Sequence, residues 1–192
     1  MADPMHAQPL QPLTALGRTT PDTVEIGPYR ITERFDVALA SLAIRRGRDQ
    51  DVVKAAQAAK LPLPGAGLAA GGTPYSTFWM TSEMWMVEAA YDGHQDIVAL
   101  LKPAFGDAAS ITEQTDAWVR FDVATPDLAP LIERLCNLDF PKAPVGFASR
   151  TVIEHTGCYL IRRAAGEVTL YAPRSSASSL LHALSVAATS VL

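Results

Sequence analysis

Apolar and polar positions follow two spacings along this chain, and short runs rich in proline and glycine separate the segments. Residues 31–45 are rich in valine, leucine and isoleucine, which predicts a strand largely buried on both faces. Asp49 or Asp51 then follows at a position suited to the N-cap of a helix. The apolar stripe of this helix consists of Val52, Val53, Ala56 and Ala59. A strand followed by an amphipathic helix is therefore predicted.

Two aromatic-rich strands and a second helix follow. The strands are predicted at 76–81 and 84–91, with a tight turn between them. Asp92 and Gln95 have the spacing of a capping box for the next helix. The apolar face of that helix consists of Ile97, Val98, Leu101 and Phe105. Pro103 is predicted to end its regular hydrogen bonding, because proline has no backbone N–H.

The second half of the chain repeats this order. Residues 111–123 predict a strand, and Asp127 predicts a helix start with Pro130 in the first turn. Three further strands are predicted at 149–154, 158–163 and 167–172, and the last helix at about 175–191. The inner face of that last helix consists of Leu180, Leu181, Leu184, Ala187 and Val191. Each half thus runs strand, helix, paired strands, helix.

The two halves also begin alike. Residues 31–36 (ITERFD) and 111–116 (ITEQTD) share four of six residues and lie 80 positions apart. Together with the shared order of elements, this predicts an α+β fold of two pseudo-duplicated strand–helix–strand–strand–helix units with mostly antiparallel sheets. At this offset Trp118 and Arg120 take the places of Ala38 and Ala40. The second copy is therefore predicted to be the one that faces a partner.

The domain organisation follows from the same pattern. Residues 1–23 contain four prolines and show no period, which predicts an extended arm that is ordered only if a partner holds it. Residues 24–192 are predicted to form a single domain, whose halves span about 24–107 and 108–192.

Composition and charge narrow the class of protein. The chain is 48% hydrophobic and 19% charged, which is typical of a globular protein, and its formal net charge is −4 without a basic run. This charge excludes the electrostatic footprint of a nucleic-acid binder. No apolar run approaches the roughly 20 residues of a membrane helix, and no signal peptide is evident. With only two cysteines as well, we expect a cytoplasmic protein with no membrane or nucleic-acid partner.

Three motifs have simple structural explanations. Residues 65–70 match a GxGxxA pattern, but they follow a helix end, which favours a flexible connection over a nucleotide site. Cys136, Cys158 and His155 lack the paired spacing of a zinc site, which favours buried thiols. Arg174 precedes Ser175 and Ser176 at a strand-to-helix transition. That transition could hold an anion, although a serine that caps the helix is the favoured interpretation.

The densest group of charges lies in the second opening strand. Alternation places Asp116, Trp118, Arg120 and Asp122 on one face of that strand. Three interpretations remain open: a protein interface, an ion-paired surface and, with Glu113, proton transfer between paired carboxylates, in that order of preference. The candidate interface residues are Asp116, Trp118, Arg120 and Arg174. No residue is predicted to be catalytic, to bind a cofactor or to ligate a metal.

Five segments, in this order, resemble the gamma subunit of heterotetrameric sarcosine oxidase. They are 78–80 (FWM), 110–122 (SITEQTDAWVRFD), 133–139 (ERLCNLD), 148–163 (ASRTVIEHTGCYLIRR) and 173–184 (PRSSASSLLHAL). The resemblance extends over about 25–192 and implies a fold like the folate-binding domain of the glycine-cleavage aminomethyltransferase, which is a duplicated α+β fold.

The resemblance also implies a function. Such an enzyme oxidatively demethylates sarcosine to glycine, passes the one-carbon unit to tetrahydrofolate or releases formaldehyde, and forms hydrogen peroxide. Its FAD, FMN and NAD belong to the alpha and beta subunits, tetrahydrofolate to alpha and zinc to delta. The chain is therefore expected to be a non-catalytic gamma subunit that carries no cofactor and has alpha, beta and delta partners. The alternatives are the equivalent subunit of a related enzyme such as N-methylglutamate dehydrogenase, an independent folate-binding protein, and a stand-alone flavoprotein.

Overall fold

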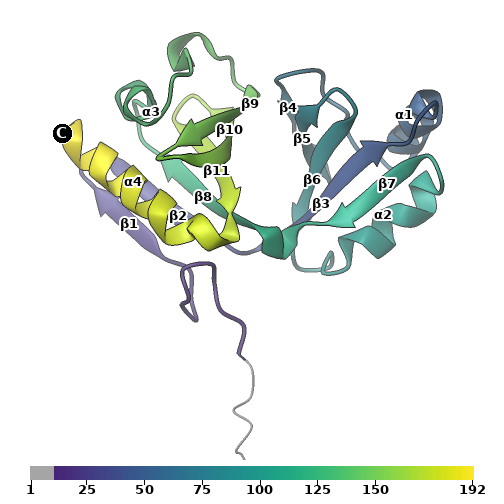
Figure 1. Ribbon diagram of the computed structural model, residues 1–192, viewed down its shortest axis with the longest axis horizontal. Coiled ribbons are helices and arrows are strands. Elements are labelled where there is room, and N and C mark those ends of the chain that lie inside the picture. The colour runs from purple at the N-terminus through teal and green to yellow at the C-terminus, as the bar shows by residue number, and fades with distance from the viewer. Residues whose placement is uncertain (1–10) are drawn as a thin grey trace, which may run out of the picture.

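The computed structural model describes residues 11–192, which form two antiparallel β-sheets with helices on their outer faces (Figure 1). The six-stranded sheet has the order β1-β2-β8-β11-β10-β9 and the five-stranded sheet β4-β5-β6-β3-β7. The strands are β1 (Thr23–Ile26), β2 (Tyr29–Arg34), β3 (Val37–Ile44), β4 (Ala69–Ala70), β5 (Ser76–Thr81), β6 (Met84–Ala90), β7 (Ala109–Glu113), β8 (Trp118–Ala124), β9 (Ala148–Ile153), β10 (Thr156–Ala164) and β11 (Glu167–Pro173). The helices are α1 (Asp49–Ala58), α2 (Ile97–Phe105), α3 (Ala129–Leu135) and α4 (Ala177–Ser190), and the short 3-10 turns are η1 (Thr115–Ala117), η2 (Phe140–Lys142) and η3 (Arg174–Ser176).

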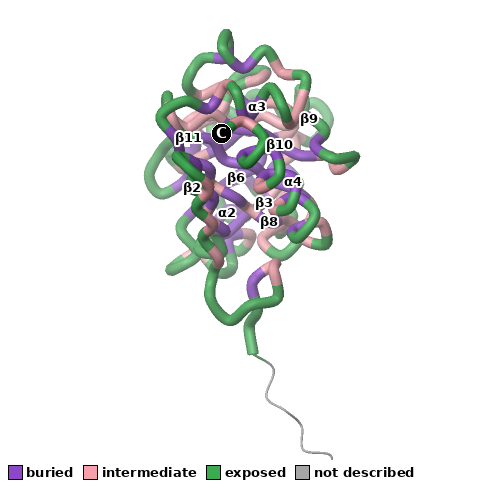
Figure 2. Tube along the Cα trace, turned by 90° about the vertical axis from the view of Figure 1, so that its left-hand side faces the viewer, coloured by how far each residue is buried: buried purple, intermediate pink, exposed green. Residues whose placement is uncertain are grey.

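Three hydrophobic clusters hold the layers together. One joins α3 and α4 to the six-stranded sheet, and a second joins α1 and α2 to the five-stranded sheet. The third lies between the sheets and includes Leu39, Phe78 and Met86 from one sheet and Tyr159 and Tyr171 from the other. Buried positions accordingly concentrate in the strands, while the connecting loops are exposed (Figure 2). The layers are therefore helix, sheet, sheet, helix. Among the helices that the structure describes, none is both long and apolar enough to cross a membrane.

Each sheet contains a strand from the other half of the chain. The predicted single strand 31–45 is wrong, because it breaks at Phe35-Asp36 into β2, which pairs with β8, and β3, which lies in the other sheet. The predicted strand 111–123 breaks in the same way at η1 into β7, which pairs with β3, and β8. Apolar residues recur along both segments because each contains two strands in succession, each with its own buried face. Hydrophobic content alone does not mark the point where the chain crosses between sheets.

The two sheets correspond strand by strand. The order β9-β10-β11-β8-β2 matches β4-β5-β6-β3-β7, with β1 added at one edge. The hairpins β5–β6 and β10–β11 each shift register near the end of the first strand, between Trp79 and Thr81 and between Arg162 and Ala164. The α+β class with antiparallel sheets is thus confirmed.

The pairing also shows that the offset between the opening strands changes by one residue. Ile31 pairs with Val123, and Ile111 pairs with Leu42, so that Leu42 and Val123 are equivalent. Trp118 therefore corresponds to Val37 rather than to Ala38, so the predicted correspondence of Trp118 and Arg120 with Ala38 and Ala40 is wrong. That the second copy faces a partner stays a prediction. The extra residue lies in the second crossing, where η1 replaces the short link between β2 and β3.

Two glycine turns join the sheets at the opposite edge. Ala69 N donates to Gly146 O (2.7 Å) and Ala148 N donates to Gly67 O (2.8 Å), which is a reciprocal pair of hydrogen bonds. Gly67 and Gly146 both have positive φ, 72° and 86°. The segment 65–70 is therefore a hydrogen-bonded turn between the sheets, where a flexible connection was predicted.

Replacing Gly146 with alanine should lower the free energy of unfolding by about 1–2 kcal/mol, because a side chain is disfavoured in the left-handed region. The added Cβ would also lie 3.3 Å from Ala69 O. Urea denaturation measures the effect. Gly65→Ala is the matched control, since its Cβ would meet nothing within 4 Å, and equal losses for the two variants would contradict the argument.

The first two helices begin differently from the prediction. Arg48, not Asp49 or Asp51, occupies the N-cap of α1. The two aspartates lie in the first turn, where their negative charges interact favourably with the helix dipole. Asp96, not Asp92, caps α2, since its Oδ1 accepts from Ala99 N at 3.0 Å. The α2 helix also continues past Pro103 to Phe105.

The last two helices agree better with the prediction. Pro130 lies in the first turn of α3, as predicted, and Asp127 Oδ1 accepts from Ala129 N at 3.1 Å, although Leu128 is the N-cap residue. Ser176, one of the two serines predicted to cap α4, occupies its N-cap position, but its side chain makes no capping hydrogen bond.

Candidate functional site

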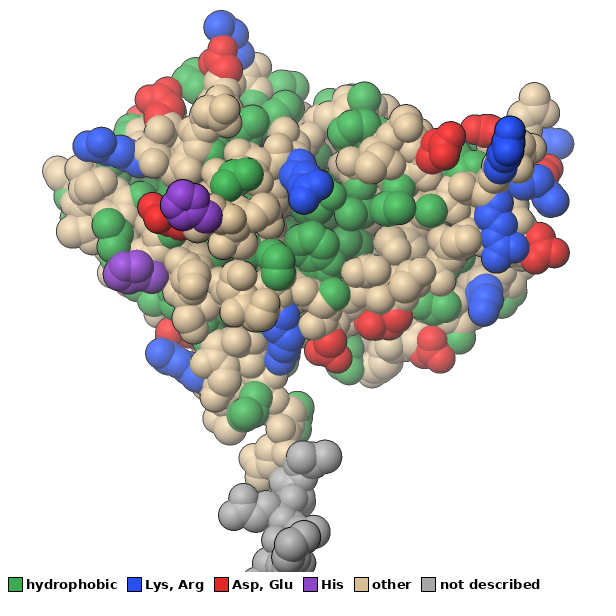
Figure 3. Space-filling model, in the orientation of Figure 1, with side chains coloured by type: hydrophobic (Ala, Val, Ile, Leu, Met, Phe, Trp, Pro, Cys, Tyr) green, Lys and Arg blue, Asp and Glu red, His purple; other side chains and the backbone are tan. Residues whose placement is uncertain are grey.

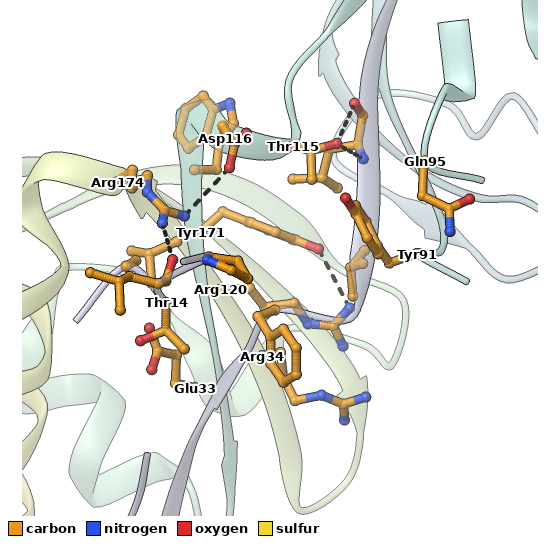
Figure 4. A pocket seen from close by; sticks show the side chains of 18 of the residues that line it. Thr14, Glu33, Arg34, Tyr91, Gln95, Thr115, Asp116, Arg120, Tyr171 and Arg174 are labelled. Carbon is orange, nitrogen blue, oxygen red and sulfur yellow. Dashed lines mark hydrogen bonds and ion pairs between the residues drawn. The ribbon is translucent and has the colours of Figure 1, made fainter. Parts of the chain in front are cut away.

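A cavity of about 500 Å³ lies where the chain crosses between the sheets (Figure 4). Both crossings line it, through Phe35 after β2 and Thr115 in η1. Residues from the N-terminal segment and from β8, β11 and η3 complete the wall. The lining combines four aromatic side chains, Phe35, Tyr91, Trp118 and Tyr171, with the charged side chains Glu33, Arg34, Glu113, Asp116, Arg120 and Arg174. A cavity of this size and mixed lining is typical of a binding site.

The four candidate interface residues all line this cavity. Trp118 and Arg120 lie in β8, but Asp116 lies in η1. The prediction that Asp116 shares their strand face is therefore wrong. Its carboxylate is 3.6 Å from Arg174 Nη1, and its side chain is 90% exposed. The structure thus brings the four residues together by a route that strand alternation does not describe.

Arg174 and the buried Glu33 hold the N-terminal segment against the domain. We call residues 11–22 the N-terminal strap. Glu33 is 1% exposed and accepts from Leu16 N (3.1 Å) and Asp22 N (3.4 Å), while Arg174 Nη2 donates to Leu13 O at 2.6 Å. The structure therefore differs from the predicted arm for 11–22, because side chains of the same chain hold it; residues 1–10 lie outside the described residues. Arg174 contacts Asp116 and the carbonyl oxygen of Leu13 in the strap. These two contacts account for the position of Arg174 without the anion that was considered there.

Replacing Glu33 with alanine should release the strap, because the N–H groups of Leu16 and Asp22 lose their acceptor. Trypsin cleavage after the exposed Arg18 should become several-fold faster, which timed digestion followed by mass spectrometry measures. Glu25→Ala, at an exposed position of β1, is the control and should leave the rate unchanged. Equal rates for the two variants would show that Glu33 does not hold the strap.

Beside the cavity, a hydrogen-bonded ring of charged and hydroxyl side chains connects the two sheets. We call Glu88, Arg120, Asp122, Arg163, Thr169 and Tyr171 the inter-sheet polar cluster. Glu88 is the member from the five-stranded sheet, and its Oε1 accepts from Tyr171 Oη (2.6 Å) and Arg163 Nη2 (2.6 Å). Arg120 donates to both carboxylate oxygens of Asp122, at 2.8 and 2.9 Å.

Thr169 closes the ring. Its hydroxyl donates to Asp122 Oδ1 at 2.7 Å and accepts from Arg163 Nε at 3.0 Å. Arg120 Nη1 also lies 3.6 Å from Glu88 Oε1. Buried charges are stable only when they are paired and hydrogen-bonded. Each charged member of this cluster has such a partner, although Glu88 pairs through Oε1 alone and its Oε2 is buried without a hydrogen-bond partner among the described residues.

The environment fixes two protonation states in the cluster. Burial raises the pKa of Tyr171 well above its usual value, and the nearby Glu88 carboxylate raises it further. Burial alone would lower the pKa of Arg120, but Tyr171, Asp122 and Glu88 outweigh that effect, so the pKa of Arg120 is raised. Arg120 therefore stays charged and Tyr171 stays neutral near neutral pH, so neither exchanges a proton readily.

The other sequence candidates are not assembled into a site. Cys158 is buried, which raises the pKa of its thiol to about 11, and His155 lies in an exposed turn. Within residues 11–192 no group of three or more His, Cys, Asp or Glu side chains could hold a metal ion. Glu113, the other carboxylate considered for proton transfer, is exposed and accepts from Thr115 N at 2.6 Å.

Sequence reasoning missed Glu33, Glu88 and Arg163. Glu88 is the one charged residue of β6 (MWMVEAA), and a lone carboxylate within an apolar strand is a signal that it is buried and paired. Glu33 stands at alternate positions with Tyr29 and Ile31 in β2, so strand alternation places it on the same buried face as these two apolar residues.

Comparisons with known proteins show the class of fold. No protein-family model matches the chain, and no curated protein matches it. Its fold is that of aminomethyltransferase-type proteins: 79% of this chain superposes on 44% of aminomethyltransferase T of the glycine cleavage system from Bartonella henselae, with a TM-score of 0.59 and 13% identity. The chain thus spans less than half of that protein.

One solved structure is more similar. A chain of the heterotetrameric sarcosine oxidase from Corynebacterium sp. U-96, solved in complex with pyrrole 2-carboxylate, matches with a TM-score of 0.76 and 16% identity over 88% of both chains. At these identities the likeness is one of fold.

Proposed function

We propose that this chain is a non-catalytic, gamma-type subunit of a heterotetrameric, flavin-dependent sarcosine oxidase, which demethylates sarcosine oxidatively to glycine. The observation that carries the proposal is the match to a chain of such an enzyme over 88% of both chains. A match of this extent covers most of that chain, rather than one domain of a larger chain. The five sequence segments that resemble the gamma subunit support the same assignment.

We infer that the two halves are copies of one unit that exchange their first strands. The matching strand orders, the register shift in each hairpin and the reciprocal glycine turns support this. In this arrangement the buried charges of the inter-sheet polar cluster hold the two copies together, which suits a structural role.

The partner surface is proposed to lie at the mouth of the cavity. Leu13, Phe35 and Tyr91 line the cavity and are 50%, 59% and 42% exposed. Trp118, Asp116 and Arg174 lie beside them, whereas Arg120 acts beneath the surface by holding the sheets. Hydrophobic side chains also gather in the middle of the face seen in Figure 3, where the halves meet, with the charged side chains mostly toward its periphery. Exposed apolar surface of this kind is typical of obligate interfaces.

The remaining components belong to the partners in this proposal. FAD, FMN and NAD would be held by the alpha and beta subunits, tetrahydrofolate by alpha and zinc by delta, in a cytoplasmic complex. This chain would contribute no catalytic residue and would bind none of these cofactors.

Co-expression with candidate alpha, beta and delta chains tests the proposal. The four chains should co-purify in equal amounts, and omission of this chain should abolish assembly or activity with sarcosine. A complex that assembles with full activity without this chain would refute the proposal. If the complex forms but oxidises another N-methyl amine, such as N-methylglutamate, the chain is the equivalent subunit of a related dehydrogenase.

An independent folate-binding protein is the second candidate, and the likeness to the aminomethyltransferase fold favours it. Saturable binding of tetrahydrofolate by the purified chain alone would support this function. A stand-alone flavoprotein would instead be yellow as purified, and a colourless preparation would reject that alternative.

A further inference from the structure

Two cavities of about 330 and 320 Å³ adjoin the inter-sheet polar cluster, and no residue of the strap lines either of them. The first lies over the polar face of β2, β8 and β11, and the second reaches toward Ser76 and Glu88 of the five-stranded sheet. Arg34, Arg120 and Arg163 line both cavities, so these three arginines form their common wall. They come from three strands, β2, β8 and β10.

Shared carboxylate oxygens connect the three guanidinium groups in series. Asp122 Oδ2 accepts from Arg120 Nη2 at 2.9 Å and lies 3.5 Å from Arg34 Nη1. Glu88 Oε1 accepts from Arg163 Nη2 at 2.6 Å and lies 3.6 Å from Arg120 Nη1. The three arginines therefore form a row, in which Asp122 joins Arg34 to Arg120 and Glu88 joins Arg120 to Arg163. Arg34 also pairs directly with Arg120 across the strands, where like charges repel.

These arginines leave some N–H groups without a short hydrogen bond, and Glu88 Oε2 beside them is buried without a hydrogen-bond partner among the described residues. Each guanidinium carries five N–H groups. Arg34 uses Nε and Nη2 on Asp36, and Arg163 uses Nε on Thr169 and Nη2 on Glu88. Among residues 11–192, Nη1 of Arg163 has no hydrogen-bond partner, and the Nη1 groups of Arg34 and Arg120 have only contacts of 3.5–3.6 Å. The Nη1 group of Arg163 is thus free at the shared wall, and those of Arg34 and Arg120 have only these long contacts.

We propose that this wall binds a phosphate group, either as inorganic phosphate or as part of a phosphomonoester. A tetrahedral oxyanion offers several acceptor oxygens in different directions and can meet donors from three strands, whereas a carboxylate offers two in one plane. Guanidinium forks are the groups that proteins favour for phosphate. Asp36, Asp122 and Glu88 balance the three arginines in charge, so directional N–H groups, not an excess of positive charge, select the ligand. This site is independent of the proposed subunit function.

Calorimetric titration of the full chain with inorganic phosphate, against sodium chloride at equal ionic strength, tests the proposal. We expect saturable binding of phosphate and none of acetate, which is the planar oxyanion control. Arg34→Gln and Arg163→Gln should weaken phosphate binding by at least about tenfold, because each loses a charge-assisted hydrogen bond. Arg48→Gln is the matched control, since Arg48 pairs with Asp51 on α1, and the affinity of this variant for phosphate should be unchanged.

Glycerol phosphate that binds as well as phosphate identifies a phosphomonoester site, and binding of phosphate alone identifies a free-ion site.

Arg34→Gln keeps the test decisive even if Arg163→Gln fails to fold. The Arg34 side chain is 40% exposed, and circular dichroism will show that the variant is folded. The proposal is overturned if the wild-type chain shows no saturable phosphate binding, if acetate binds equally well, or if Arg34→Gln binds phosphate as tightly as Arg48→Gln.

Discussion

Replacing Glu88 with alanine should lower the free energy of unfolding by about 3–5 kcal/mol, which is the cost of leaving a buried charge without its partner. The Glu88 side chain is only 5% exposed, and its Oε1 accepts two hydrogen bonds of 2.6 Å from the opposite sheet. Without the carboxylate, Arg163 loses its ion pair and the fully buried Tyr171 hydroxyl loses its acceptor. Urea denaturation followed by far-UV circular dichroism measures the loss.

Two further variants separate the buried ion pair from other effects. Glu25→Ala removes a carboxylate that is 74% exposed and 4.0 Å from Arg30, and it should change stability by less than about 1 kcal/mol. Glu88→Gln keeps the shape and one acceptor, so it should fall between the wild type and Glu88→Ala. A loss for Glu88→Ala no larger than that for Glu25→Ala would show that the polar cluster does not hold the sheets together.

Local elements follow closely from the sequence. The predicted strand 76–81 coincides with β5, and 84–91 differs from β6 by one residue. Both have clear alternation or aromatic enrichment and a tight turn between them, so their limits depend on neighbouring residues alone. Helix starts are less well predicted, because more than one side chain near each helix could act as the cap.

Long-range arrangement could not be derived in the same way. Nothing within 31–45 shows that β2 and β3 belong to different sheets, because both strands bury apolar faces. The same limitation applies to the site. Alternation correctly groups Trp118, Arg120 and Asp122, but the partners that complete their environment lie far away in sequence. Arg120 and Tyr171 are 51 residues apart, and Asp122 and Thr169 are 47 residues apart.

The one-residue change of offset had the largest consequence for the interpretation of the site. At an offset of 80, Trp118 and Arg120 replaced alanines and were expected to face outward to a partner. In the structure Trp118 lies against Tyr159 between the sheets, with ring centroids 5.6 Å apart, and the Arg120 side chain is 18% exposed. The exposed apolar residues around the cavity are instead Leu13 in the strap, Phe35 in a crossing and Tyr91 directly after β6.

The double variant Leu13→Asp/Phe35→Asp should therefore weaken association with the partner subunits by at least about 100-fold. Apolar hot spots contribute about 2 kcal/mol or more each to association, and the variant also adds two charges to a desolvated surface. Both side chains are at least half exposed in the isolated chain, so the variant should fold and unfold like the wild type. Pull-down from the four-chain co-expression, followed by analytical ultracentrifugation of the purified components, measures the association.

Val53→Asp is the matched control for this surface, because Val53 is a 46% exposed apolar residue on α1 that does not line the cavity. Full assembly of Val53→Asp together with loss of assembly in the double variant would locate the partner at the mouth of the cavity. Full assembly of both would exclude this surface while leaving the subunit proposal intact, since a partner could contact another face. Loss of assembly in both variants would point to general sensitivity to surface charge, and the interface would then have to be sought along the whole outer surface of the chain.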